Sequence, residues 1–463
     1  MGREKAAGGD LPGRARIARL AWPIVLANCA VPLLGLVDTA VIGRTGTVEA
    51  LGAIALGALV FSFVYWSFGF LRMGTTGLAA QASGAGDQAE VRAAVGRALL
   101  AGAALGLLIL LLQRPIARLA LALLDASAGV ETITRAYLLT RVWGAPATLA
   151  TFAVNGALIG LGATRRLLAV QLFLNGLNMA LDVLFAGVLG WGARGIALGT
   201  ALSEWTALGF GLWLLLGLLR ERRRDGEPFW PPERLRDTAK LLGTVRVNAD
   251  IMVRTIFLML GFAWFTNQGA RYGDVTLAAN HVLLQLVSFT AFFLDGFAFA
   301  TESLVGEAVG GRRVDLFDAA TRRSSELAAT TAALLAGAVW LLGPALIAEL
   351  TDLPAVRGTA THYLPFAAVY VLLSFPAFQL DGIFIGATRT RAMRNASIAS
   401  LAVFLVAWRL LALGRGNRGL WIAFIVYVVA RAVALAVPFR ALRASIAPER
   451  ERGAFLDGTT GRS

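Results

Sequence analysis

Long apolar runs, separated by short polar segments, follow one another along the whole chain. Runs such as "AVGRALLAGAALGLLILLLQ" are continuous and lack the alternation of apolar and polar residues that marks a half-buried strand. About 20 helical residues cross the ~30 Å hydrocarbon core of a bilayer. A segment in lipid must satisfy its own backbone groups, and closed barrels read as shorter alternating segments. The pattern therefore predicts transmembrane helices.

The runs predict twelve spans. Their approximate bounds are 16–42, 50–83, 91–113, 131–162, 166–189, 193–220, 238–266, 275–308, 317–346, 357–387, 392–413 and 418–443. Residues 114–130 are also apolar, but the segment is short and contains Pro115. We expect it to be a re-entrant or interfacial piece rather than a span.

Basic residues mark one side of the membrane. The segment before the first span, the loop "RERRRDGEPFWPPERLRD" after the sixth, "GGRRVDLF" and the tail "RALRASIAPERER" fall on the same side of a twelve-span chain. The opposite loops, such as "GWGARG" and "GRGNRG", are short and carry fewer basic residues. Because cytoplasmic loops concentrate Lys and Arg, both termini are expected in the cytoplasm.

The chain also repeats itself. When it is shifted by 226 residues, "LGAIALGALVFSFVYWSFGFLRMGTTGLAAQASGAG" falls on "LAANHVLLQLVSFTAFFLDGFAFATESLVGEAVGGR" without a gap. "NGALIGLGATR" meets "DGIFIGATR" after a two-residue adjustment. Two halves of six spans each have the same topology, which is a parallel repeat typical of transporters.

We therefore predict an all-α polytopic membrane protein with twelve transmembrane helices in two pseudo-symmetric six-helix lobes. The expected divisions are a cytoplasmic tail (1–15), an N-terminal lobe (16–219), a basic cytoplasmic linker (220–237), a C-terminal lobe (238–445) and a second cytoplasmic tail (446–463).

Composition narrows the function. Of the 463 residues, 57% are hydrophobic, and the formal net charge is +14. The basic residues gather at the ends of spans, so the charge indicates membrane topology rather than nucleic-acid binding. Cys29 is the single cysteine, which excludes an internal disulfide and a cluster of thiolate ligands.

Four polar residues of the N-terminal half lie at one depth. Asp38 is near the outer end of span one, and Thr200 is about two turns below the outer start of span six. Asn178 and Asp182 in span five are four residues apart and share a helix face. At 1.5 Å per residue, all four lie about 10 Å below the outer surface. Two carboxylates, an amide and a hydroxyl can hold a proton or a hard cation.

The repeat partners of this set are apolar in character. They are Trp264, Ala402, Val406 and Phe424. General helix packing is thus a poor account of the polar set, and ionisable residues within spans are costly and usually functional. The alternative is that Asp38 reaches the headgroups and that Asn178 and Thr200 join helices by hydrogen bonds.

Other intramembrane residues are weaker candidates. Asn155 and Asp381, which are repeat partners near inner span ends, either line an inward mouth or cap helices. Asp295 and Glu302 in span eight are placed on the substrate path, together with Arg254 as their pairing partner. Pro23 interrupts the hydrogen bonding of the first helix and is expected to act as a hinge.

Several stretches resemble the multidrug and toxic compound extrusion (MATE) transporters, in the branch named for the DNA-damage-inducible F protein (DinF). They are "LAWPIVLANCAVPLLGLVDTAVIGRTG", "NMALDVLF", "GARGIALGTALSEW" and "LDGFAFATESLVGEAVG". The resemblance implies cation-coupled export of bulky, often cationic amphiphiles, with Asp38, Asn178, Asp182 and Thr200 as the coupling site. Two positions depart from relatives: Leu34 stands for a tyrosine, and Arg254 for the glutamate of the sodium-coupled branch.

The expected function is therefore an antiporter, not an enzyme. It has no cofactor, and its coupling ion is H⁺ or Na⁺. Its partners are drug-like small molecules and the lipid bilayer, and we expect a monomer in the bacterial inner membrane. Protons are favoured because one carboxylate suffices and span seven lacks the glutamate of the sodium-coupled branch; a sodium ion could still bind the four oxygen-bearing residues. The alternatives are a lipid-linked precursor flippase and a non-transporting membrane scaffold or receptor.

Overall fold

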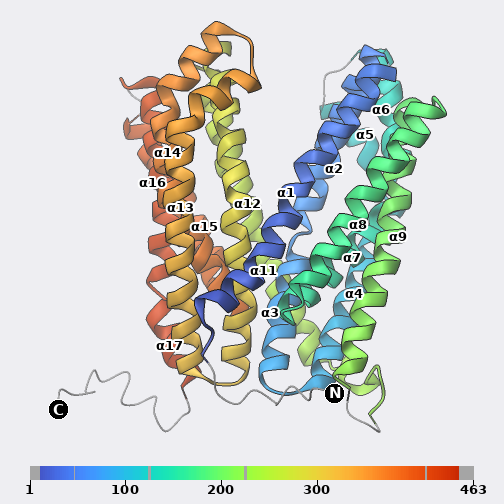
Figure 1. Ribbon diagram of the computed structural model, residues 1–463, viewed down its shortest axis with the longest axis vertical. Helices are drawn as coiled ribbons and strands as arrows, with labels where there is room; N and C mark the ends of the chain where they lie inside the picture. The colour runs from blue at the N-terminus through green and yellow to red at the C-terminus, as the bar shows by residue number, and fades with distance from the viewer. Residues whose placement is uncertain (1–10, 46, 124–126, 224–226, 412–413, 448–463) are drawn as a thin grey trace. The chain divides into compact units, whose positions relative to one another are not determined.

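The computed structural model describes residues 11–45, 47–123, 127–223, 227–411 and 414–447. Within these ranges every regular element is helical and none is a strand. Figure 1 shows the helices in chain order. The prediction of an all-α chain is thus confirmed.

The first half of the chain forms the helices α1 to α9 with two irregular turns. Their bounds are α1 (Arg14–Thr45), α2 (Val48–Ser67), α3 (Phe70–Gly84), α4 (Gln88–Leu111), α5 (Gln113–Leu123), α6 (Ala128–Arg141), η1 (Val142–Gly144), α7 (Ala145–Gly160), α8 (Thr164–Asp182), η2 (Val183–Val188) and α9 (Gly192–Glu221).

The second half forms longer, mostly continuous helices. Their bounds are α10 (Pro232–Leu235), α11 (Thr238–Ala270), α12 (Asp274–Gly310), α13 (Val314–Leu350), α14 (Pro354–Gly386), α15 (Thr390–Leu411), α16 (Gly416–Ala436) and α17 (Phe439–Ile446). Eleven helical segments of the described residues are long and apolar enough to cross a bilayer, and α1 is a further helix of 32 residues. Together they are the twelve predicted spans. The eleven-residue α5, in the region expected to be re-entrant or interfacial, is too short to span.

The chain divides into two compact units. The N-terminal unit comprises Pro23–Ala82 and Asp87–Met252, and the C-terminal unit comprises Met1–Trp22, Ser83–Gly86 and Val253–Ser463. Two helices change unit along their length, α1 at Pro23 and α11 between Met252 and Val253.

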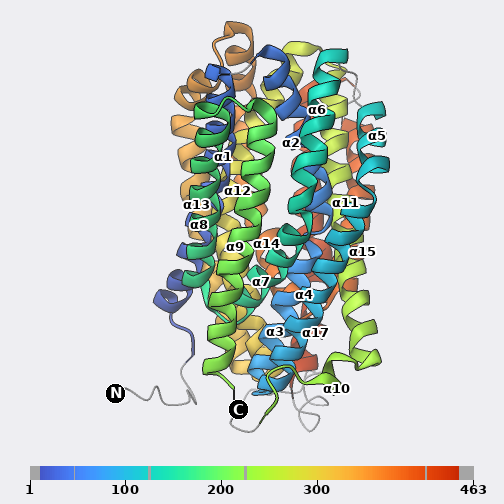
Figure 2. The same ribbon diagram turned by 90° about the vertical axis from the view of Figure 1, so that its right-hand side faces the viewer.

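In the N-terminal unit, α4 packs on α7, and α9 packs on α6, α7 and α8 (Figure 2). In the C-terminal unit, α12, α13 and α14 pack together, and α16 packs on α14 and α15. The core of the C-terminal unit is strongly aromatic, with Phe265, Phe404, Trp421, Phe424 and Tyr427 all buried.

Three predicted spans of the N-terminal unit are interrupted. Span 50–83 is divided between α2 and α3 at Phe68–Gly69, and span 131–162 is divided by the 3₁₀ turn η1. Span 166–189 ends in the wide turns of η2, where the N–H of Leu189 donates to the carbonyl of Leu184, five residues earlier. Hydropathy did not predict these breaks because the apolar runs continue through them.

The segment predicted as a linker is held against α4. Arg92 pairs with Glu227 at 2.5 Å, Arg234 of α10 pairs with Asp87 at 2.5 Å, and Lys240 pairs with Glu90 at 2.5 Å. The linker is therefore attached to the N-terminal unit by several ion pairs.

Candidate functional site

The structure brings three of the four predicted coupling residues together between α8 and α9. Asn178 Nδ2 donates a hydrogen bond of 3.2 Å to Thr200 Oγ1, whose own hydroxyl donates to the Ile196 carbonyl at 2.9 Å. Asn178 is 1% exposed, Asp182 is 0% exposed and Thr200 is 6% exposed. We call Asn178, Asp182 and Thr200 the α8–α9 site.

The Asp182 carboxylate of α8 fits against α9 because the facing residue, Gly199, has no side chain. Asp182 Oδ1 lies against Gly199, where an added Cβ would stand 2.8 Å from it. Any larger residue at position 199 would push this oxygen away. Glycine therefore lets the Asp182 carboxylate lie directly on α9, beside Thr200.

Asp182 is also the last residue of regular α-helix in span five. The chain continues as the π-helical turns of η2 from Val183 to Val188. Such turns are rare, and within helices they often occur at functional sites. The carboxylate therefore stands where the backbone changes its hydrogen-bonding pattern.

The α8–α9 site is rich in oxygen. Asn178 Oδ1 is buried and has no hydrogen-bond partner among the described residues. Amide, hydroxyl and carboxylate oxygens suit a proton or a hard cation. No group of three His, Cys, Asp or Glu side chains able to bind a metal occurs in the part of the chain that the structure describes.

Two predictions concern α1. Asp38 belongs to this helix, but its side chain lies outside the described residues, as does that of Leu34. Pro23 is buried, and it is the residue at which α1 passes from one unit to the other.

In the C-terminal unit, Arg254 of α11 pairs with Asp381 of α14. Arg254 Nη2 donates to Asp381 Oδ2, and Arg431 Nη2 of α16 lies 3.6 Å from the same oxygen. The Arg431 guanidinium lies over the Phe378 ring, 5.8 Å from its centre. All three charged residues are buried. Asp381, expected at an inward mouth or a helix end, is thus held by two arginines.

The remaining candidates are dispersed. Asp295 is half-buried and interacts electrostatically with Arg431, while Glu302 is buried on α12. Arg254, which we expected to pair with these two acids, donates a hydrogen bond to Asp381. Asn155 belongs to α7 in the N-terminal unit, and its buried Oδ1 has no hydrogen-bond partner in the described part of the chain.

The prediction did not single out a second buried polar group in the N-terminal unit. It comprises Tyr65, Arg141, Thr148 and Glu204, from four different helices. The signal was present in "GTALSEW", where Glu204 follows Thr200 by four residues and so shares its helix face.

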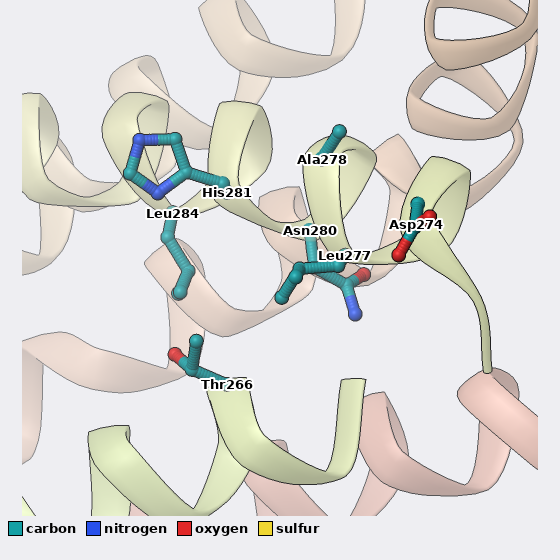
Figure 3. Close-up of a pocket in the computed structure, with 7 residues that line it drawn as sticks. All are labelled: Thr266, Asp274, Leu277, Ala278, Asn280, His281 and Leu284. Carbon is teal, nitrogen blue, oxygen red and sulfur yellow. The ribbon is translucent and has the colours of Figure 1, made fainter. Parts of the chain in front are cut away.

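A cavity of about 390 Å³ lies in the C-terminal unit, away from the predicted residues. Figure 3 shows its lining, with Thr266 on the end of α11 and Asp274, Leu277, Ala278, Asn280, His281 and Leu284 on the first turns of α12. Asn280 is engaged by Asn417 at 2.8 Å and by Trp421 at 2.9 Å. The buried Asn280 side chain in the cavity lining therefore already has hydrogen-bond partners.

Twelve spanning helices, two compact units and a buried oxygen-rich site define a membrane transporter of the two-lobed class. A profile of the MatE family matches residues 23–184 and 251–408. The chain belongs to the MatE family, whose members among its relatives are transporters rather than enzymes.

Among its relatives is the DNA damage-inducible protein F of Escherichia coli. The two are 39% identical over 427 residues, which cover 91% of each chain. A probable multidrug resistance protein NorM of Aromatoleum aromaticum is 28% identical, over 88% of this chain and 86% of that protein.

Solved structures share the fold. A transporter of the MOP superfamily from Pyrococcus furiosus superposes with a TM-score of 0.84 at 21% identity, over 94% of this chain and 97% of that one. A multidrug resistance MATE family transporter in an outward-facing conformation gives 0.83 at 22% identity, over 94% and 96%. The predicted family and fold class are thus confirmed.

Proposed function

We propose that the chain is a secondary active antiporter of a bacterial inner membrane. It exports cationic or amphiphilic organic compounds in exchange for protons by alternating access. The name of its relative in A. aromaticum, a probable multidrug resistance protein, supports a role in drug resistance. The observation that carries the proposal is the burial of Asp182 beside Asn178 and Thr200.

The chemistry of exchange follows from a single carboxylate. The ionised form of Asp182 attracts a cationic substrate, and the protonated form does not. A proton and a cation therefore compete for the site, and each weakens the binding of the other by the same factor. Alternate opening of such a site to the two sides makes this competition an antiport.

Protons fit the site better than sodium. A hard cation such as Ca²⁺ typically takes 6–8 oxygen ligands, and the described α8–α9 site supplies only the oxygens of Asn178, Asp182 and Thr200. In the C-terminal unit, Asp381 is occupied by Arg254 and Arg431, so it offers no free carboxylate for a second cation.

The test uses purified full-length protein in proteoliposomes. Efflux of a fluorescent organic cation is followed under a proton gradient in sodium-free buffer and, separately, under a sodium gradient. We expect the proton gradient alone to drive efflux in the wild type. Asp182→Asn should reduce efflux to the level of empty vesicles, because the neutral amide cannot exchange a proton.

Asp352→Asn is the control, because its carboxylate is fully exposed. It should transport like the wild type. Efflux that needs sodium would refute the proton assignment. Normal proton-driven efflux by a correctly inserted Asp182→Asn protein would remove Asp182 from the coupling site.

A further inference from the structure

The second polar group of the N-terminal unit surrounds Glu204. This residue lies on α9, four positions after Thr200, which places it about 6 Å farther along the helix. Because α9 runs from the outside to the cytoplasm, Glu204 is one turn deeper than the α8–α9 site. It is 8% exposed.

The backbone makes room for this carboxylate. Glu204 Oε2 lies against Gly144, at a place that any Cβ on residue 144 would occupy. Gly144 ends the 3₁₀ turn η1 that interrupts span four. The adjacent Trp143 carbonyl accepts a hydrogen bond of 2.9 Å from Trp205 Nε1, which fixes η1 against α9.

Thr148 of α7 lies close to both the Glu204 carboxylate and the Tyr65 hydroxyl of α2. Its own proton is donated to the Gly144 carbonyl, at 3.2 Å. The Thr148 hydroxyl can also rotate about its C–O bond and donate to the Glu204 carboxylate. Such a donor suits the ionised carboxylate, which can only accept hydrogen bonds.

Arg141 of α6 supplies the opposite charge. Its Nη1 donates to the Tyr137 hydroxyl at 2.8 Å, and its guanidinium lies over the Phe61 ring, 4.7 Å from the centre. Arg141 and Glu204 interact electrostatically without a direct ion pair among the described residues. The arginine can thus stabilise the ionised carboxylate without occupying it.

Three buried polar atoms of this group lack hydrogen-bond partners in the described ranges. They are Glu204 Oε2, the Tyr65 hydroxyl oxygen and Arg141 Nε. Buried polar groups are nearly always satisfied by protein or by ordered water. An arginine N–H, a phenol and a carboxylate provide the donors and acceptors that a bridging water needs.

We propose that Glu204 is a second proton-carrying carboxylate, in a hydrated site with Tyr65, Arg141 and Thr148. The ionised form accepts a hydrogen bond from Thr148 and faces Arg141 through water, and the protonated form donates to that water. The proton comes from a hydronium ion, which leaves as water, and it returns to water when Glu204 ionises. Of the charged or titratable side chains on the helices packed against α9, Tyr65 (α2) and Arg141 (α6) interact with Glu204. The others on these helices are Glu49 (α2), Glu131, Arg135 and Tyr137 (α6), and Arg165, Arg166 and Asp182 (α8).

This inference rests on the proposed proton-coupled export, and its test separates the two. Protons released when a fluorescent organic cation binds to the solubilised full-length protein are counted with a pH dye in weak buffer. The wild type should release protons. Glu204→Gln should release about half as many, because one of two linked carboxylates is lost.

Two further variants complete the measurement. Glu221→Gln, on the same helix but with an exposed carboxylate that pairs with Arg166, should release as many protons as the wild type. Glu204→Asp keeps a titratable group and should restore release. Thr148→Val removes a donor to the ionised form, so the midpoint of release should move toward higher pH.

Each outcome of this measurement either supports or overturns the role of Glu204. No release from the wild type overturns both the proposed function and the role of Glu204. Normal release from the wild type and from Glu204→Gln overturns only the role of Glu204. If Glu204→Gln does not fold, the Thr148→Val shift decides, and an unchanged midpoint refutes the proposal.

Discussion

Corresponding helices of the two units differ in their continuity. Span two is broken between α2 and α3, whereas its repeat partner α12 runs unbroken from Asp274 to Gly310. Span four is broken at η1, whereas α14 is continuous; span five ends in η2, whereas α15 is regular as far as its last described residue, Leu411. Two of the three breaks touch polar groups, because Gly144 meets Glu204 and α8 ends at Asp182. Irregular backbone thus occurs in the unit that contains the α8–α9 site.

The same positions serve packing in the other unit. Thr200 corresponds to Phe424, which is buried and lies 4.4 Å from Phe265 and 4.7 Å from Tyr370 between ring centres. Asp182 corresponds to Val406. One framework therefore holds an oxygen-rich site in the N-terminal unit and an aromatic core in the C-terminal unit.

Buried charge is also handled differently. In the C-terminal unit, Asp381 is enclosed by Arg254 and Arg431. In the N-terminal unit, Glu204 keeps an oxygen without a hydrogen-bond partner among the described residues. A carboxylate that is paired with buried arginines, which we call a closed pair, stabilises the fold or one conformation. A carboxylate with an oxygen that lacks a hydrogen-bond partner can exchange a proton.

The largest effect is expected from opening the closed pair. Asp381→Leu leaves two arginines buried without their shared anion, and breaking a buried pair in this way costs about 3–5 kcal/mol. The double variant Arg254→Met with Asp381→Leu should recover part of that loss. Thermal unfolding in detergent measures both. A single variant as stable as the double variant would show that the pair does not balance buried charge.

The second prediction concerns the aromatic core. Phe→Ala in a core costs about 3–5 kcal/mol. Because lipid is as apolar as the protein core, the transfer of the side chain between them contributes little, and the cost comes mainly from the cavity that the substitution leaves. We therefore expect Phe424→Ala to lower the free energy of unfolding by about 3 kcal/mol. Its counterpart Thr200→Ala removes one hydrogen bond, which is worth about 0.6 kcal/mol in a membrane. Thr200→Ala should instead slow export about threefold, because a change of about 0.6 kcal/mol in free energy corresponds to a factor of about three. Equal losses of stability would contradict the division of roles.

The sequence predicted much of this molecule from long-range regularities. Continuous apolar runs determine the spans, and the spacing of four between Asn178 and Asp182 determines a shared face. The Arg254–Asp381 pair was not predicted, because its members lie 127 residues apart and only packing decides the contact. Glu204 was missed because residues were grouped by depth, and it lies one turn deeper than Thr200.

The third prediction compares the two helices that change unit. α1 does so at Pro23, and α11 does so at Met252–Val253 without a proline. Proline removes a backbone hydrogen bond and permits bending. If α1 bends there during transport, Pro23→Ala should slow turnover by about tenfold, or about 1.4 kcal/mol in the barrier, with normal expression. Unchanged transport kinetics would exclude a hinge at Pro23.

The smallest effect is expected at the pair between Asp87 and Arg234, because Asp87 lies between the candidate spans Val48–Gly84 and Gln88–Leu111 rather than within one. Burial of Asp87 opposes its ionisation, but hydrogen bonds from Arg234 and from the Glu90 amide prevail and hold the pKa of this carboxyl below its ordinary value of 3.8. Asp87 also caps α4, and asparagine caps equally well. Asp87→Asn therefore keeps the cap and removes the charge together with the acceptor for Arg234.

We expect Asp87→Asn to cost about 0.5 kcal/mol at pH 7, since exposed ion pairs contribute little. A carboxyl with a lowered pKa in the folded state stabilises that state above its unfolded-state pKa. The contribution is lost as the pH falls through the folded-state value. The difference in unfolding temperature between Asp87→Asn and the wild type should therefore disappear well below pH 3.8. If Asp87→Asn lowers the free energy of unfolding as much as Asp381→Leu does, the pair of Asp87 with Arg234 stabilises the protein as strongly as the buried pair does.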